Sequence, residues 1–299
     1  MKKTLIALAT LAAFSGAAFA QSSVTLSGVI GAGVTSSNFK DGTSTQVLGS
    51  TDNAVTFAVT EDLGGGMKVS ASQTLAFGGA QGGTATNDGG NIAISGGFGE
   101  AKFGMACAGA ALGEAVVGGA YHFAHALGTT GSDCREYKYA LYTLPSLVNG
   151  LTMAVRVQNT AAGNALNVND FSATANGLQY RFNYATGALT TGVYIRSTTS
   201  EVHAAYDFGV AKVSYGADTK VASGDKRTEI GVSAPFGAVT LKAGYGKKGA
   251  IKGSQVGAFY ALSKRTTLGA IVGNFTANAA QLDNIEQTKS TRVSLTHAF

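Results

Sequence analysis

Apolar and polar residues alternate along most of the chain after its first twenty positions. In LTMAVRV (residues 151–157) the odd positions are apolar, and the even positions are Thr152, Ala154 and Arg156. LQYRFNY (178–184) and VTLKAGY (239–245) repeat this pattern. A period of two residues predicts β-strands with one apolar and one polar face.

Sixteen segments show this alternation, and an even number is what a closed bacterial barrel requires. They cover approximately residues 24–35, 53–60, 67–77, 90–96, 101–108, 136–144, 151–158, 178–184, 188–197, 200–207, 210–218, 227–233, 238–246, 254–261, 266–275 and 290–299.

The connectors decide between two architectures that share this pattern, a soluble β-sandwich and a membrane barrel. Short turns such as EDLGGG (61–66) and PFGA (235–238) alternate with longer stretches, including 35–52, 108–135 and 159–177. Short turns on one rim and long loops on the other are typical of outer-membrane proteins. We therefore predict an all-β fold, a 16-stranded antiparallel transmembrane β-barrel formed by residues 21–299.

The two ends of the chain fit an exported barrel. Residues 1–20 combine Lys2 and Lys3 with an apolar stretch and the small-residue motif AFA, which predicts a signal peptide. TRVSLTHAF (291–299) alternates up to Phe299. In a closed barrel this last strand has to pair with the first, expected at SVTLSGV (23–29), because an open edge would leave backbone groups unpaired in lipid.

Composition argues against other classes of protein. Charged residues make up 13% of the chain, against roughly 25% in soluble domains. The formal net charge is +5, and the basic residues are spread along the chain instead of forming the clustered face of a nucleic-acid binder. No nucleophile elbow or phosphate-binding loop occurs, so we expect no catalytic residue, no cofactor and no enzyme activity.

Five segments in chain order resemble Gram-negative general porins of the β-proteobacterial type. They are SSVTLSGVIGAGV (22–34), NAVTFAVTEDLGGGMKVSASQTLAF (53–77), NIAISGGFGEAKFG (91–104), LSKRTTL (262–268) and VSLTHAF (293–299). The resemblance implies an outer-membrane homotrimer of 16-stranded barrels, surrounded by lipid and lipopolysaccharide, each with a water-filled channel narrowed by an inward-folded third loop. It also implies that Phe299 is a signal recognised by the barrel-assembly machinery.

The third loop is expected at residues 108–133. Its small and apolar residues favour folding back into the barrel over an external flap. Its only acids, Glu114 and Asp133, are candidates for the constriction, unless they are merely solvated. The chain departs from the family at Met105, where similar porins carry an arginine.

Basic residues fall on the polar face of many predicted strands, and in lipid that face points into the water-filled lumen. The predicted pore-lining residues are Lys68, Lys102, Arg156, Arg181, Arg196, Lys212, Lys242 and Arg292. Because they outnumber the acids assigned to the lumen, we predict a mild preference for anions. Any of these residues that lie at the rims of the barrel would have no effect on ion selectivity.

The only two cysteines, Cys107 and Cys134, bracket the third loop. An exported protein can form a disulfide there, and two unpaired thiols are the alternative. His122 and His125 have a spacing that could share a metal, but no further ligand cluster completes a site, so we expect no metal.

These features predict passive diffusion of small hydrophilic solutes and ions through an outer-membrane porin. Three alternatives stay open at this point. A substrate-selective channel and a structural or adhesive barrel with a plugged lumen share the fold, whereas a soluble periplasmic sandwich does not.

Overall fold

The computed structural model describes residues 22–50, 53–77, 85–107, 136–159, 177–221, 226–249, 251–276 and 287–299. In these ranges the regular structure consists of seventeen β-strands. They are β1 (Ser23–Phe39), β2 (Ser44–Ser50), β3 (Ala54–Gly64), β4 (Met67–Phe77), β5 (Ala85–Gly96), β6 (Gly99–Cys107), β7 (Glu136–Thr143), β8 (Leu151–Gln158), β9 (Leu178–Thr186), β10 (Leu189–Arg196), β11 (Thr199–Asp207), β12 (Lys212–Val221), β13 (Arg227–Phe236), β14 (Val239–Lys248), β15 (Ile251–Ala261), β16 (Thr266–Phe275) and β17 (Gln287–Ala298).

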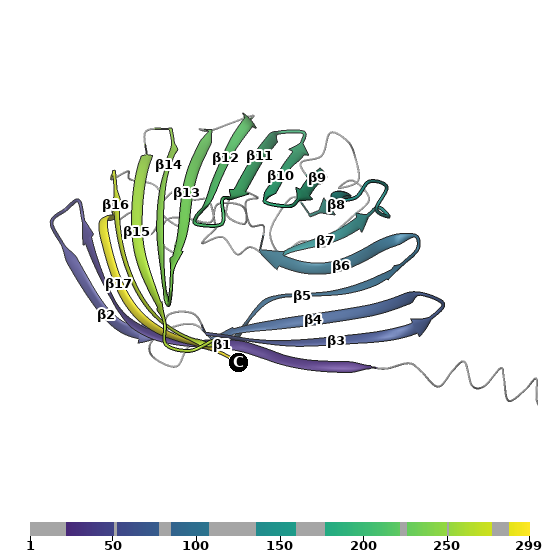
Figure 1. Ribbon diagram of the computed structural model, residues 1–299, viewed down its shortest axis with the longest axis horizontal. Helices are drawn as coiled ribbons and strands as arrows, with labels where there is room; N and C mark the ends of the chain where they lie inside the picture. Colours follow the sequence, from purple (N-terminus) through teal and green to yellow (C-terminus); the bar gives the residue numbers. More distant parts are fainter. Residues whose placement is uncertain are drawn as a thin grey trace, which may run out of the picture.

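The strands form a single closed barrel. Apart from β2 and β3, strands that follow one another in the chain pair antiparallel, and β17 pairs with β1, so that the sheet returns to its start (Figure 1). β2 and β3 lie end to end along β1, against its Ala32–Asn38 and Ser23–Val29 portions respectively. They share one position in the wall, so the seventeen strands occupy sixteen positions. The predicted 16-stranded antiparallel barrel is confirmed.

One predicted loop was wrong in part. Residues 35–52 were expected to be irregular, but β1 continues to Phe39 and β2 returns beside it. The hairpin supplies backbone partners to residues 32–38 of β1, which would otherwise lack a neighbour on that side. Val47 and Leu48 in β2 have the high β-propensity that such a strand needs.

The seam between β1 and β17 differs from the expected register. β17 pairs with Val29–Phe39 of β1, whereas Ser23–Val29 pairs with β3. Closing a barrel requires tilted strands with a staggered register, and this offset is part of that stagger. Beyond Ala298, the Phe299 amide donates to the Gly28 carbonyl and the Gly28 amide donates to the Phe299 carbonyl, both at 3.0 Å.

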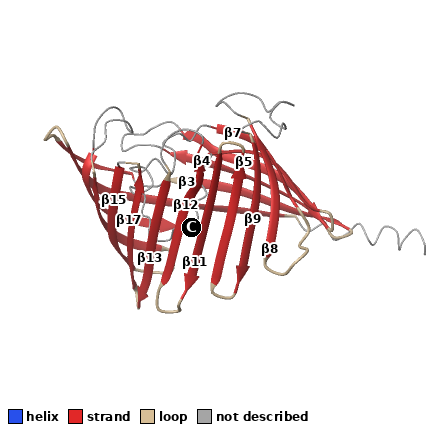
Figure 2. Cartoon of the chain, turned by 90° about the horizontal axis from the view of Figure 1, so that it is seen from above, coloured by secondary structure: helices blue, strands red, loops and turns tan. Residues whose placement is uncertain are grey.

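Short turns join the strands along one rim, which in Figure 2 runs from the lower edge to the right-hand side. In two of them an aspartate carboxylate accepts from the amide two residues later, Asp62 from Gly64 and Asp207 from Gly209, each at 2.8 Å. Gly64, Gly65 and Gly66 all have positive φ angles, which other residues rarely adopt. This local geometry explains the EDLGGG sequence of the β3–β4 turn.

Asp41, in the β1–β2 turn at the other rim, has the same arrangement. Its carboxylate accepts from the Thr43 hydroxyl at 2.6 Å and from the Thr43 amide at 2.8 Å. These bonds, the hydroxyl first, lower the pKa of Asp41 below its ordinary value. The ionised carboxylate therefore stabilises the turn above the unfolded pKa, and this contribution disappears as the pH falls through the folded pKa.

We expect Thr43→Val to raise the pKa of Asp41 part of the way toward its ordinary value, because the hydroxyl donor is lost while the amide donor stays. NMR titration of the labelled aspartate carboxyl in nanodiscs measures this shift. Thr45→Val, two residues away in β2, is the control and should leave the Asp41 titration unchanged. An unchanged titration in Thr43→Val would contradict the assignment.

Candidate functional site

The two faces of the barrel wall differ in chemistry. On β15 the outward Val256 is 59% exposed, whereas its neighbour Gln255 is 3% exposed. On β17 Val293 is 48% exposed and Arg292 only 4%. Apolar side chains suit lipid and polar ones suit a wet lumen. The face that carries Gln255 and Arg292 is therefore the inner face.

Three arginines lie on the inner face of neighbouring strands β8, β9 and β10. Arg156 of β8 is directly opposite Gln179 of β9, which in turn is opposite Arg196 of β10. Arg181 lies two residues beyond Gln179, in the next row of the wall. We call Arg156, Arg181 and Arg196 the arginine cluster.

Neighbouring side chains hold two of these guanidinium groups in place. The Arg156 Cζ lies 4.5 Å from the centroid of the Tyr139 ring, and the Arg181 Cζ lies 4.8 Å from that of Tyr194. Arg181 also donates from Nε to Gln179 Oε1 at 2.6 Å. Stacking on an aromatic face stabilises the cation and restricts the guanidinium. These positive charges are thus attached to a rigid part of the wall.

An acidic region follows directly on β11, β12 and β13. Glu201 is opposite Tyr194 on one side and Asp218 on the other, so the row that starts at Arg181 continues into these carboxylates. Glu201, Asp218 and Glu229 are all buried, at 7%, 8% and 3% exposure. The inner wall therefore changes sign between β10 and β11.

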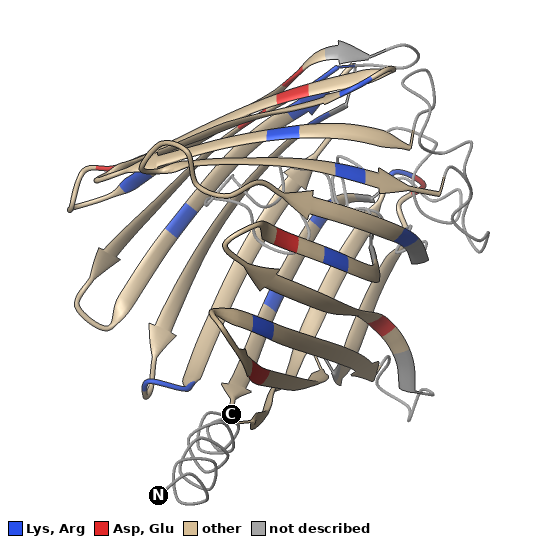
Figure 3. Ribbon diagram, turned by 90° about the vertical axis from the view of Figure 1, so that its right-hand side faces the viewer, with Lys and Arg blue, Asp and Glu red and all other residues tan. Residues whose placement is uncertain are grey.

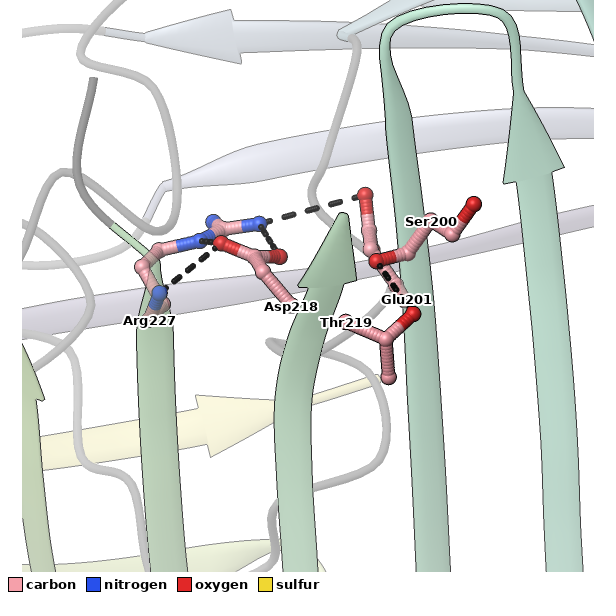
Figure 4. Close-up of polar contacts among 5 residues, drawn as sticks. All are labelled: Ser200, Glu201, Asp218, Thr219 and Arg227. Carbon is pink, nitrogen blue, oxygen red and sulfur yellow. Dashed lines mark hydrogen bonds and ion pairs between the residues drawn. The ribbon is translucent and has the colours of Figure 1, made fainter. Parts of the chain in front are cut away.

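Arg227 partly neutralises this acidic region (Figure 4). Its Nε and Nη2 donate to the two carboxylate oxygens of Asp218 at 2.9 and 3.0 Å, and its backbone amide donates to Oδ2 at 3.0 Å. The Nη2 atom is also 3.9 Å from Glu201 Oε1. Two parallel hydrogen bonds make this a strong, directional ion pair.

The other predicted basic residues divide into two groups. Lys68 and Lys212 lie opposite Asp62 and Asp207, and the Lys102 Nζ is 2.9 Å from Glu100 Oε1. These three lysines lie beside acids close to the short turns. Lys242 Nζ is instead 5.1 Å from the centroid of the Phe259 ring, and Arg292 is buried on β17. Figure 3 shows charged residues on many strands around the wall.

Several candidates lie outside the described residues. These are the third-loop acids Glu114 and Asp133, both histidines His122 and His125, and Cys134 of the predicted disulfide; Cys107 ends β6. Met105 is described, and it lies on the outer face of β6. It has the parity of Phe103, which is 57% exposed on the outer face.

The sequence survey missed Arg227 and the three buried acids. RTEIGVS (227–233) places Arg227 and Glu229 together on the polar face, so the alternation already contained the signal. Glu201 and Asp218 also lie on predicted strands, but the prediction of pore-lining residues rested on the basic side chains alone. Their proximity depends on strand register, which alternation within one strand does not specify.

The part of the chain that the structure describes contains no cluster of metal-ligating residues and no membrane-spanning helix. No group of three or more His, Cys, Asp or Glu is placed to hold a metal ion there. Among the same residues, no helix is long and apolar enough to cross a membrane.

Comparison with known proteins assigns the fold to a family. The family model described as Gram-negative porin matches residues 7–280. Outer membrane porin protein 32 of Delftia acidovorans is 44% identical over 113 residues, which are 35% of this chain and 31% of that protein. The match thus spans about a third of that relative's length.

Solved structures resemble the barrel over nearly all of the chain. The anion-selective porin from Comamonas acidovorans superposes with a TM-score of 0.68 at 21% identity, covering 93% of this chain and 100% of that one. A triple mutant of the Rhodopseudomonas blastica porin gives a TM-score of 0.62 at 12% identity, with the same coverage. At these identities the likeness shows the fold alone.

Proposed function

Because the chain belongs to the Gram-negative porin family and is a closed β-barrel of the outer membrane, we propose that it forms a water-filled channel for small hydrophilic solutes and ions, with a mild preference for anions. The family and the fold point to a channel rather than to an enzyme. The mechanism is passive diffusion. The barrel satisfies the backbone hydrogen bonds in lipid, and its polar inner face holds water.

The arginine cluster is the observation that carries the anion preference. Its three charges lie on adjacent strands and two of them are fixed against tyrosines, whereas Lys68, Lys102 and Lys212 lie beside acids. Fixed charge on a pore wall raises the local concentration of the opposite ion. The Comamonas acidovorans porin, which shares the fold, is called anion-selective, and this supports the same assignment.

We expect the wild-type channel to give a reversal potential of anionic sign in a potassium chloride gradient across a planar bilayer. Replacing Arg156, Arg181 and Arg196 together by glutamine should move that potential toward cation preference, since the acids on β11–β13 keep their charge. The effect should shrink at high salt, because the Debye length falls from about 10 Å at 0.1 M to about 3 Å at 1 M.

The matched control removes three charges outside the inner face. Lys264 and Arg265 lie in the β15–β16 turn, and Lys289 is exposed on the outer side of β17. Their replacement by glutamine should leave the reversal potential unchanged. Cation preference of the wild type, or an equal shift in both triple variants, would overturn the proposed selectivity.

The same recordings separate the channel from its two rivals within the fold. A plugged structural or adhesive barrel would give no stepwise conductance. A substrate-selective channel would show saturable block by one class of solute. None of the described residues forms a binding site that indicates such a solute. Stepwise, unsaturated conductance is the outcome that supports general diffusion.

The proposal extends to assembly and to the third loop. We propose a homotrimer in which residues 108–133 fold into the lumen, with Glu114 and Asp133 toward the arginine cluster and a Cys107–Cys134 disulfide fixing the loop. Phe299 would be recognised by the barrel-assembly machinery, and residues 1–20 would be removed on export.

Labelling of the unreduced, purified protein with a maleimide tests the Cys107–Cys134 disulfide, because two reactive thiols would exclude it.

A further inference from the structure

A histidine, His203, lies on the inner face of β11. It is two residues from the inner-face Glu201, and its side chain is half-buried. His297, the other histidine in the described ranges, is exposed on the outer face of β17, with the parity of Val293. Histidine is the side chain whose charge ordinarily changes between about pH 5 and 8. His203 therefore gives the inner wall a charge that depends on pH.

Glycines on both neighbouring strands make room for the His203 ring. Gly192 of β10 and Gly216 of β12 are directly opposite His203. A Cβ on Gly192 would lie 2.6 Å from both Cε1 and Nε2 of the imidazole, and it would collide with Asn183 Oδ1 of β9. The ring therefore lies over Gly192, on the side of β11 that faces the arginine cluster.

Tyr194 connects His203 to the arginine cluster. The centroids of the Tyr194 and His203 rings are 5.4 Å apart, and the rings meet at 83°. The same tyrosine ring lies 4.8 Å from the Arg181 Cζ. One aromatic side chain thus contacts both the imidazole and a guanidinium group of the cluster. A proton on His203 extends the positive part of the wall from β10 onto β11, across the line where the wall changes sign.

Charged and titratable groups surround His203 on the same face of the wall. They are Arg181 on β9, Tyr194 and Arg196 on β10, Glu201 on β11, Asp218 on β12, and Arg227 and Glu229 on β13. The arginines stay charged at every pH of interest. The carboxylates take up protons as the pH falls, and this changes the charge of the wall in the same direction as protonation of His203. A substitution, and not the pH profile alone, has to separate the two effects.

We propose that His203 is a selectivity-determining residue of the channel, and that its protonation strengthens the anion preference as the pH falls. The added charge joins the arginine cluster and offsets the acidic region on β11–β13. Both effects raise the concentration of anions at this part of the wall. The inference rests on the proposed channel function and names the residue through which pH regulates its ion preference.

The test compares reversal potentials of the full-length channel in a potassium chloride gradient at about pH 8 and about pH 5. In the wild type the ratio of chloride to potassium permeability should rise about twofold at about 0.1 M salt, the effect of one charge within a Debye length of the ion path. His203→Gln should match the wild type at the higher pH and lack most of this rise. His203→Lys, which is charged at both pH values, should already show the higher ratio at about pH 8.

The matched control replaces the other three histidines, His122, His125 and His297, by glutamine and leaves His203 as the only histidine of the chain. This variant should keep the full rise. A rise that persists in His203→Gln would overturn the inference, because the carboxylates or another histidine would then cause it. Loss of the rise in the triple variant would overturn it as well.

The same recordings distinguish this inference from the proposed anion preference. A wild-type channel that prefers cations at both pH values, but shifts toward anions only when His203 is present, would contradict the proposed preference and support the role of His203. A wild-type channel that prefers anions equally at both pH values would do the reverse. Recordings from single channels report assembled protein alone, so a lower yield of His203→Gln does not affect the comparison.

Discussion

Replacing Gly33 by valine is expected to prevent closure of the barrel. Gly33 lies on the inner face of β1 directly opposite Ser294 of β17, at the seam where the first and last strands meet. A Cβ at this position would collide with the Val293 carbonyl oxygen and lie 2.8 Å from the Ser294 Cα. These are backbone atoms of the partner strand, so no side-chain rotation relieves the clash.

The consequence is larger than for an ordinary overpacked site, which costs about 1–3 kcal/mol. If β17 moves away from β1, the backbone groups that face each other across the seam lose their partners within lipid, where each unpaired group costs several kcal/mol. Gly33→Val should therefore yield little folded barrel, read as loss of the heat-modifiable band on electrophoresis of outer-membrane fractions.

Ala32→Val is the matched control. Ala32 is the preceding residue of the same strand, and it is exposed on the opposite, outer face. The two added methyl groups then meet lipid, and folding should be unchanged. Normal assembly of Gly33→Val would show that the seam tolerates separation and would contradict this account of closure.

The wall of the barrel was predictable from the sequence because a strand's two faces meet different solvents. Alternation in segments such as 151–157 and 266–275 specified both strand position and the inward parity of residues such as Arg156. The extension of β1 to Phe39 and the return along β2 were not predictable in the same way. There the stretch 35–52 mixes polar residues with a few apolar ones, and only pairing with a neighbour makes it a strand.

The arrangement of charges was predictable only in part, for a related reason. The alternation within each strand assigns Arg181 and Glu201 to the inner face. It does not specify the register, that is, which residue of one strand lies opposite which residue of the next. The register places Arg181, Tyr194, Glu201 and Asp218 in a single row. The counts of bases and acids predicted an excess of basic residues in the lumen, whereas the register separates an arginine cluster from an acidic region that contains its own cation.

Replacing that cation, Arg227, by methionine is expected to have the second large effect. Methionine keeps most of the apolar volume, but Glu201, Asp218 and Glu229 then remain close together on β11–β13 without it. Removing one partner of a buried ion pair costs about 3–5 kcal/mol. The lower end of that range applies here, because the wall adjoins a wet lumen. Unfolding in urea, followed by far-UV circular dichroism, measures the loss.

The same substitution should also change selectivity. With Arg227 absent, the acidic region loses the positive charge of this guanidinium, so the reversal potential should shift toward cations while the arginine cluster is intact. Arg265→Met is the control, because Arg265 is exposed in the β15–β16 turn and should change neither quantity.

A second substitution distinguishes a lost ion pair from a loss of packing. Asp218→Asn removes the carboxylate that accepts both side-chain hydrogen bonds from Arg227. Combined with Arg227→Met, it should recover about 1–2 kcal/mol of stability, because fewer like charges then face one another, and part of the selectivity shift should reverse. Strictly additive losses in the double variant would mean that Arg227 acts through its packing, and that the acidic region does not depend on it for charge compensation.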